Sequence, residues 1–151
     1  MKLKIIFLAA TVFVGFSNAQ ILPKIYDSAR NPNNDATQAL KMAKESGKNI
    51  LIDVGGDWCI DCRRLDQFLK DNPVIYKDLN NKFIFFKVYV GSEKDNSEFF
   101  SQLPRLRWVP SFVLISPVGK ITRLVDTREL SVNSSYDKTK FKILIQSNGL
   151  K

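Results

Sequence analysis

The feature that most constrains this chain is the segment GGDWCIDC, residues 55–62, which holds both of its cysteines, Cys59 and Cys62. A short apolar run over residues 50–54 predicts a buried strand immediately before it. From Cys59 to about Lys70 the apolar residues recur with helical spacing. The pair therefore lies at a strand-to-helix junction, where it could be half of a metal site, a structural crosslink or a redox centre.

The residue inventory bears on each of these three interpretations. A structural zinc site needs four ligands, usually Cys or His, and the chain has two cysteines and no histidine. A disulfide stabilises a fold most when it closes a long loop, and only Ile60 and Asp61 separate this pair. The free N–H groups and dipole of a helix start favour a thiolate at Cys59. The redox interpretation is therefore favoured, with Cys59 as the attacking cysteine and Cys62 as the buried resolving cysteine.

The pattern around the motif predicts one α/β domain, with a central mixed sheet flanked by helices. Asp35 is expected to cap a first helix, and Ser135 a last one that stops at Gly149. Further helices are expected over residues 59–70, from Pro73 and over 97–103, and strands over 50–54, 82–91, 110–116 and 120–127.

The first nineteen residues have the pattern of a secretory signal peptide. Two lysines precede an apolar run from Ile5 to Phe16, and a small-x-small site ends at Ala19. The run is shorter than the roughly 20 residues needed to span a bilayer. We therefore expect cleavage near Ala19 and a periplasmic or secreted protein, with residues 20–34 as an extended lead-in and 35–151 as the domain. An oxidising compartment allows a disulfide to persist.

The basic character of the chain does not point to a nucleic-acid partner. The formal net charge is +8, but lysines and arginines are spread along the chain without a basic block. We expect a monomer that needs no metal or other cofactor, because the cysteine pair is itself the redox group.

The residues LIDVGGDWCIDC (51–62), followed by VPS (109–111), resemble the thioredoxin superfamily. They are similar in particular to exported bacterial thioredoxin-like proteins related to the C-terminal domain of the disulfide reductase DsbD. The lead-in IYDSARNPNNDATQAL (25–40) looks like the same branch. The resemblance implies a thioredoxin fold and thiol–disulfide oxidoreductase activity on protein or small-molecule disulfides. It also suggests a membrane relay of the DsbD type as electron donor.

The resemblance implies roles for five further residues. Trp58 would shield the first sulfur, and Asp53 would accept the proton of the resolving cysteine, with Lys87 near it. Pro110 matches the family's cis-proline, which would set the Val109 backbone to pair with a substrate strand. Each has an ordinary alternative: a packed aromatic, an ionised strand-end aspartate, a solvated lysine and a trans edge proline.

Charges beside the cysteines bear on the direction of the reaction. The carboxylates of Asp57 and Asp61 oppose a second negative charge on a thiolate, and Arg63 and Arg64 partly offset them. We therefore expect a reducing dithiol, nearer the roughly −270 mV of thioredoxin than the roughly −120 mV of DsbA. A disulfide oxidase or isomerase, and a non-catalytic peptide-binding module of the same fold, are the alternatives.

Overall fold

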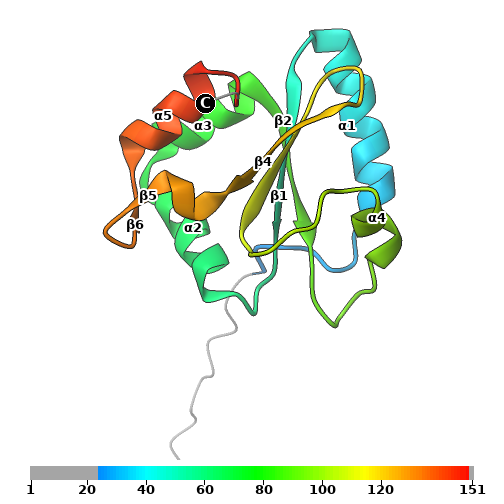
Figure 1. Ribbon diagram of the computed structural model, residues 1–151, viewed down its shortest axis with the longest axis horizontal. Coiled ribbons are helices and arrows are strands. Elements are labelled where there is room, and N and C mark those ends of the chain that lie inside the picture. The colour runs from blue at the N-terminus through cyan, green and yellow to red at the C-terminus, as the bar shows by residue number, and fades with distance from the viewer. Residues whose placement is uncertain (1–23, 150–151) are drawn as a thin grey trace, which may run out of the picture.

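Figure 1 presents the structure, a computed structural model that describes residues 24–149. The expected signal peptide (1–19) and the start of the expected lead-in lie outside these residues. No helix within the described part of the chain is long and apolar enough to cross a membrane. The elements are α1 (Pro32–Ser46), β1 (Asn49–Gly55), α2 (Ile60–Asp71), α3 (Pro73–Lys82), β2 (Phe83–Tyr89), α4 (Ser97–Ser101), β3 (Ser111–Ile115), β4 (Ile121–Asp126), the 3-10 helix η1 (Thr127–Leu130), β5 (Ser131–Val132), β6 (Ser135–Tyr136) and α5 (Lys138–Gln146).

The four longer strands form one mixed sheet in the order β2-β1-β3-β4. Strand β1 runs parallel to β2 and antiparallel to β3, and β4 is antiparallel to β3. Every residue of β1 is buried, as expected of a central strand covered on both faces. The predicted α/β architecture with a mixed sheet between helices is thus confirmed.

Side-chain alternation along β1 assigns its residues to two separate cores. Leu51 packs with apolar residues of α2, α3 and α5. Ile50, Ile52 and Val54 pack on the opposite face, with residues of α1 and α4. Figure 1 shows α1 and α4 on one side of the sheet and the other three helices on the other. Because successive strand side chains point to opposite faces, Asp53 shares the face of Leu51 and lies under α2.

Helix α1 begins earlier than the sequence predicted. It starts at Pro32 rather than after Asp35, so it takes up the end of the expected lead-in. The Asn31 side chain caps it by accepting from the N–H groups of Asn33 and Asn34. Asn at the cap followed by proline in the first turn is a favourable helix start. Asp35 instead lies in that turn, with Arg30 Nη2 2.6 Å from its Oδ1.

The expected last helix is present as α5, but it does not begin at Ser135. Strands β5 and β6 pair there as a small hairpin, turning at Asn133 and Ser134, whose φ angles are 49° and 63°. Two positive φ values suit the tight turns that join paired strands. Helix α5 starts only after Asp137, whose side chain accepts from the Lys140 N–H.

Helix α5 holds α2 in place through aromatic packing. The ring of Phe141 lies 4.8 Å from that of Phe68 on α2 and 6.4 Å from that of Phe112 on β3. Phe141 is fully buried, whereas Ile143 on the same helix is exposed.

We predict that Phe141→Ala lowers the free energy of unfolding by about 3–5 kcal/mol, because it leaves a cavity between α5, α2 and the sheet. Ile143→Ala is the matched control and should change it by less than about 1 kcal/mol. Chemical denaturation of both variants measures the effect. Equal losses in the two variants would contradict this account of the core.

Candidate functional site

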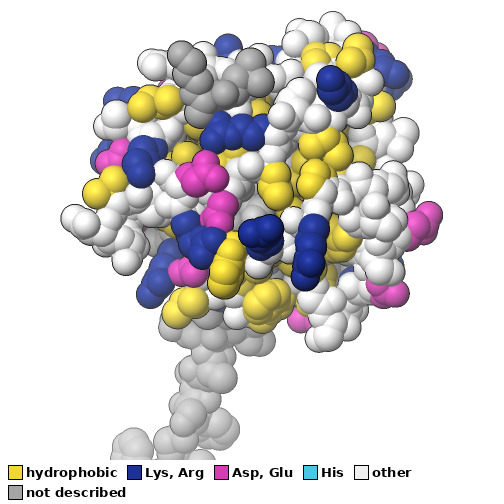
Figure 2. Space-filling model, in the orientation of Figure 1, with side chains coloured by type: hydrophobic (Ala, Val, Ile, Leu, Met, Phe, Trp, Pro, Cys, Tyr) yellow, Lys and Arg dark blue, Asp and Glu magenta, His cyan; other side chains and the backbone are white. Residues whose placement is uncertain are grey.

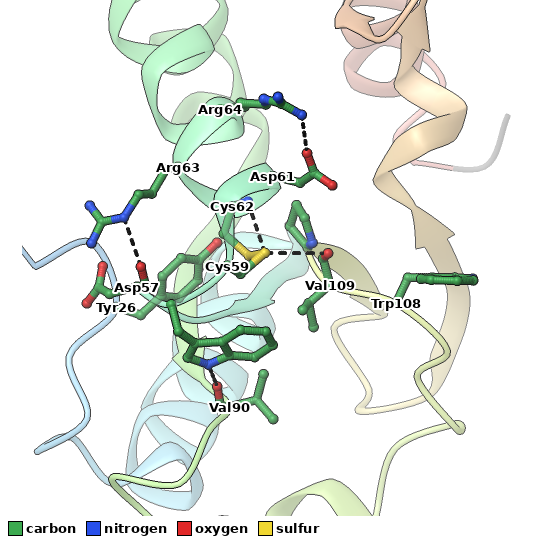
Figure 3. The surroundings of a disulfide bond; sticks show 12 residues. Tyr26, Asp57, Cys59, Asp61, Cys62, Arg63, Arg64, Val90, Trp108 and Val109 are labelled. Carbon is green, nitrogen blue, oxygen red and sulfur yellow. Dashed lines mark hydrogen bonds and ion pairs between the residues drawn. A yellow bond between two sulfur atoms is a disulfide. The ribbon is translucent and has the colours of Figure 1, made fainter.

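The two cysteines form a disulfide at the start of α2, with their Cα atoms 5.3 Å apart (Figure 3). Cys59 is the N-cap residue, and its Sγ accepts from the Cys62 N–H at 3.1 Å. Cys59 is 7% exposed and Cys62 is 0% exposed. The first sulfur thus lies near the surface at the positive end of the helix, and the second lies beneath it, as the spacing predicted.

Trp58 lies on the surface rather than in a core, with 63% of its area exposed. Its Nε1 donates to the Val90 carbonyl at 2.7 Å, which fixes the indole beside the loop that follows β2 (Figure 3). A Cβ on Gly56 would come within 2.7 Å of that same carbonyl. Glycine at position 56 therefore leaves room for the loop beneath the indole.

The loop before β3 approaches the first sulfur. The peptide bond between Val109 and Pro110 is cis, and the Val109 carbonyl oxygen lies 3.6 Å from Cys59 Sγ. Trp108 is exposed, and the guanidinium of Arg128 lies 4.2 Å from its ring centroid. A hollow beside the disulfide is lined by residues of α2, this loop and η1, among them Asp61, Trp108, Pro110 and Arg128.

Each of the four charged residues around the helix start has a hydrogen-bond partner, but only Arg64 and Asp61 pair with each other. Arg64 Nη1 lies 2.8 Å from Asp61 Oδ1. Arg63 Nε donates to the backbone carbonyl of Asp57 at 2.8 Å. The Asp57 carboxylate accepts from the Ile25 N–H of the lead-in, also at 2.8 Å. Arg64 therefore offsets the charge of Asp61 only in part, because the pair is exposed to solvent, while Arg63 holds the turn that carries Trp58.

Asp53 is 0% exposed, which rules out the alternative of a solvated strand-end aspartate. The Tyr26 hydroxyl lies 2.9 Å from its Oδ1 and 3.0 Å from its Oδ2. Lys87 Nζ lies 3.6 Å from Oδ2. On its other side, Lys87 donates to Asp66 of α2 at 3.0 Å, and Lys70 ion-pairs with Asp66 at 2.7 Å.

Two members of this network were missed from the sequence. Asp66 belongs to the helical pattern of α2, and nothing local distinguishes it from a solvated aspartate. Tyr26 falls in the lead-in, which was expected to be merely extended, yet its ring is buried against the cysteines. The one local signal was an aromatic residue, next to Ile25, in a stretch of mostly polar residues.

Burial has the largest effect on the pKa of Asp53, the acid at the centre of this network. It raises the pKa of Asp53 to about 6, although Lys87 and the Tyr26 hydroxyl act in the opposite direction. Burial, followed by the charge of Asp53, raises the pKa of Tyr26. Burial alone would also raise the pKa of Asp66, but hydrogen bonds from Lys70 and Lys87 outweigh it and hold that pKa below its ordinary value.

We predict that wild-type stability falls as pH rises from about 4 to about 7. Because burial raises the pKa of Asp53 from 3.8 to about 6, the folded protein keeps a proton in this window that the unfolded chain has released. The loss should be on the order of 2–3 kcal/mol, at about 1.4 kcal/mol for each pKa unit. Chemical denaturation at a series of pH values measures it.

In the same series, Asp53→Asn should be more stable than the wild type at neutral pH and should lack this pH dependence. Asp71, exposed at the end of α2, provides the control, and Asp71→Asn should behave as the wild type does. An Asp53→Asn variant that loses stability in parallel with the wild type would refute the assignment.

Comparison with known proteins agrees with this geometry. Residues 31–117 match the sequence model of a family described as Thioredoxin-like. A thioredoxin H-type of Fagopyrum esculentum is 32% identical over 95 residues, which cover 61% of this chain and 72% of that protein.

Solved structures share the fold. A disulphide isomerase from Xylella fastidiosa Temecula1 superposes with a TM-score of 0.68 at 24% identity, covering 83% of this chain and 97% of that one. The C-terminal domain of Neisseria meningitidis DsbD, in its reduced form, gives 0.59 at 16% identity, covering 78% and 96%. The family match spans more than half of the chain, and the cysteine pair lies within it. The protein therefore belongs to the thioredoxin-like family of thiol–disulfide oxidoreductases.

Proposed function

We propose that this protein is an exported reductase of protein disulfides. The observation that carries the proposal is the position of the two sulfurs. Cys59 caps a helix near the surface, with a helical N–H directed at its Sγ, and Cys62 is buried directly behind it. Such an arrangement stabilises a thiolate on the outer cysteine and protects the inner one for the second step.

The reaction transfers two electrons from the dithiol to a substrate disulfide. The Cys59 thiolate attacks one substrate sulfur, the substrate S–S bond breaks, and the other sulfur leaves as a thiolate. Cys62 then gives up its proton and attacks Cys59 Sγ, which breaks the mixed disulfide and releases the reduced substrate. Asp53, whose pKa is raised to about 6, is the base for that proton, and Lys87 stabilises its carboxylate. No cofactor takes part.

Substrate would bind across the exposed surface around Cys59. A substrate strand pairing with the backbone of Val109 would present its sulfur to Cys59, since the Val109 carbonyl lies 3.6 Å from Sγ. Pro110 shapes this loop, and Trp58 shields the sulfur from the other side. Trp58, Ile60 and Trp108 are exposed large apolar residues around the pair. They favour extended, apolar segments of the kind that unfolded proteins present.

Several parts of the proposal draw on the sequence rather than on the described residues. Export is supported by the signal-peptide pattern at residues 1–19. A dithiol that reduces substrates must itself be reduced, and a membrane relay of the DsbD type is the donor we propose. We expect the protein to work as a monomer.

We predict that Cys59→Ser abolishes insulin disulfide reduction, whereas Cys62→Ala accumulates a mixed disulfide on Cys59. The first change removes the nucleophile, and the second removes the group that releases substrate. Trapped partners of Cys62→Ala, identified by mass spectrometry from the exporting cell, name the substrates. A Cys59→Ser protein that keeps its full effect in that cell would instead support a peptide-binding module.

We predict a reduction potential near −270 mV, and in any case below about −180 mV. Removing one carboxylate with Asp61→Asn should raise the potential by up to about 30 mV, a tenfold change in the equilibrium with glutathione. The exposed Asp71 at the far end of α2 is again the control. A wild-type potential above about −180 mV would indicate an oxidase or isomerase.

A further inference from the structure

Tyr26 connects the buried acid to the cysteine pair. It is 1% exposed although it precedes the first helix, and it packs in one cluster with Cys59 and Cys62. Its hydroxyl is within hydrogen-bond distance of both carboxylate oxygens of Asp53. Figure 3 shows its ring beside the disulfide at the start of α2.

The end of β1 shows how close this hydroxyl comes to the resolving sulfur. A Cβ on Gly55 would lie 2.6 Å from Tyr26 Oη and 2.8 Å from Cys62 Sγ. Tyr26 Oη and Cys62 Sγ therefore both border the position that a Cβ of residue 55 would occupy, and this position is empty because residue 55 is glycine. Once Cys62 is released from the disulfide, rotation of its side chain toward this point would bring the thiol to the tyrosine oxygen.

We propose that Tyr26 relays the proton of Cys62 to Asp53 in the resolving step, an inference that rests on the proposed function. As Cys62 attacks Cys59 Sγ, its thiol proton passes to Tyr26 Oη, while the tyrosine's own proton passes to Asp53. The Cys62–Cys59 bond forms and the bond from Cys59 to the substrate breaks. The departing substrate thiolate then takes up a proton, and Asp53 returns to its charged form.

The charges that face Asp53 suit this relay. Lys87 of β2 approaches Oδ2, Asp66 of α2 holds Lys87 from the far side, and Tyr26 of the lead-in donates to both oxygens. Since its pKa is raised, Tyr26 does not ionise by itself, and the two proton transfers must occur together.

The test separates the two thiol steps in time. Reduced protein is mixed with one equivalent of 5,5′-dithiobis(2-nitrobenzoate) in a stopped-flow instrument across a pH series. Attack by Cys59 releases the first chromophore, and attack by Cys62 on the mixed disulfide releases the second. Tyr26→Phe keeps the ring and removes only the hydroxyl.

In Tyr26→Phe we expect the rate of the first phase to be unchanged. The second phase should be about tenfold or more slower than in the wild type at pH values below the ordinary thiol pKa of about 8.5. Above that pH the second-phase rates of the two proteins should become equal. Above this pH the Cys62 thiol loses its proton to the solvent and needs no relay. A packing defect would instead slow the second phase at every pH. Tyr89→Phe is the matched control, because Tyr89 is buried in the same cluster but its hydroxyl accepts from the Glu93 N–H. It should match the wild type in both phases.

If the second-phase rate is the same in Tyr26→Phe and the wild type, or is lowered equally at every pH, the relay is overturned and the proposed function stays intact. Failure of the unmodified protein to give a first phase would instead overturn the proposed function. If Tyr26→Phe does not fold, the unmodified protein still provides a test. In mixtures of light and heavy water, a plot of the second-phase rate against the deuterium fraction should be curved, because two protons move in the same step. A straight line would contradict the relay.

Discussion

The burial of one carboxylate under helix α2 is the constraint on which the site depends. Asp53 points into the core because it shares a strand face with Leu51, and burying a charge without partners is expensive. The protein meets this cost with a tyrosine hydroxyl from the lead-in and a lysine from β2, itself held by Asp66. Among the described residues, no buried side-chain nitrogen or oxygen lacks a hydrogen-bond partner. Helix, strand and lead-in are thus tied together at the point where the cysteines lie.

The same arrangement divides the roles of the two sulfurs. The helix start provides N–H groups and a positive dipole for Cys59, which lies near water. Cys62, one helical turn later, is buried against Tyr26, whose hydroxyl contacts the buried acid. The ion pair between Arg64 and Asp61 removes part of the negative field expected at the helix start. Of the two arginines expected to offset the carboxylates, only Arg64 pairs with one, because Arg63 donates to the backbone carbonyl of Asp57.

Local pattern was enough to predict β1 and the strand-to-helix junction, because an apolar run and helical periodicity are properties of neighbouring residues. It could not show that Tyr26 reaches Asp53, because that contact joins distant parts of the chain. The β5–β6 hairpin was missed for another reason. Its turn uses Asn133 and Ser134 at positive φ, where glycine is the usual signal. The boundary of α1 was misjudged because Asn31 and Asp35 are both acceptable caps and the fold selected the first.

The lead-in has a consequence for what counts as the smallest working unit of this protein. The match to the Thioredoxin-like family begins at residue 31, after both Ile25 and Tyr26. A version that began at residue 31, where that match starts, would retain the cysteines, the sheet and the buried acid. It would lose the backbone donor to Asp57 and the hydroxyl on Asp53. Under the proposed relay, the groups that serve the reaction therefore extend beyond the residues that the family model matches, into the lead-in.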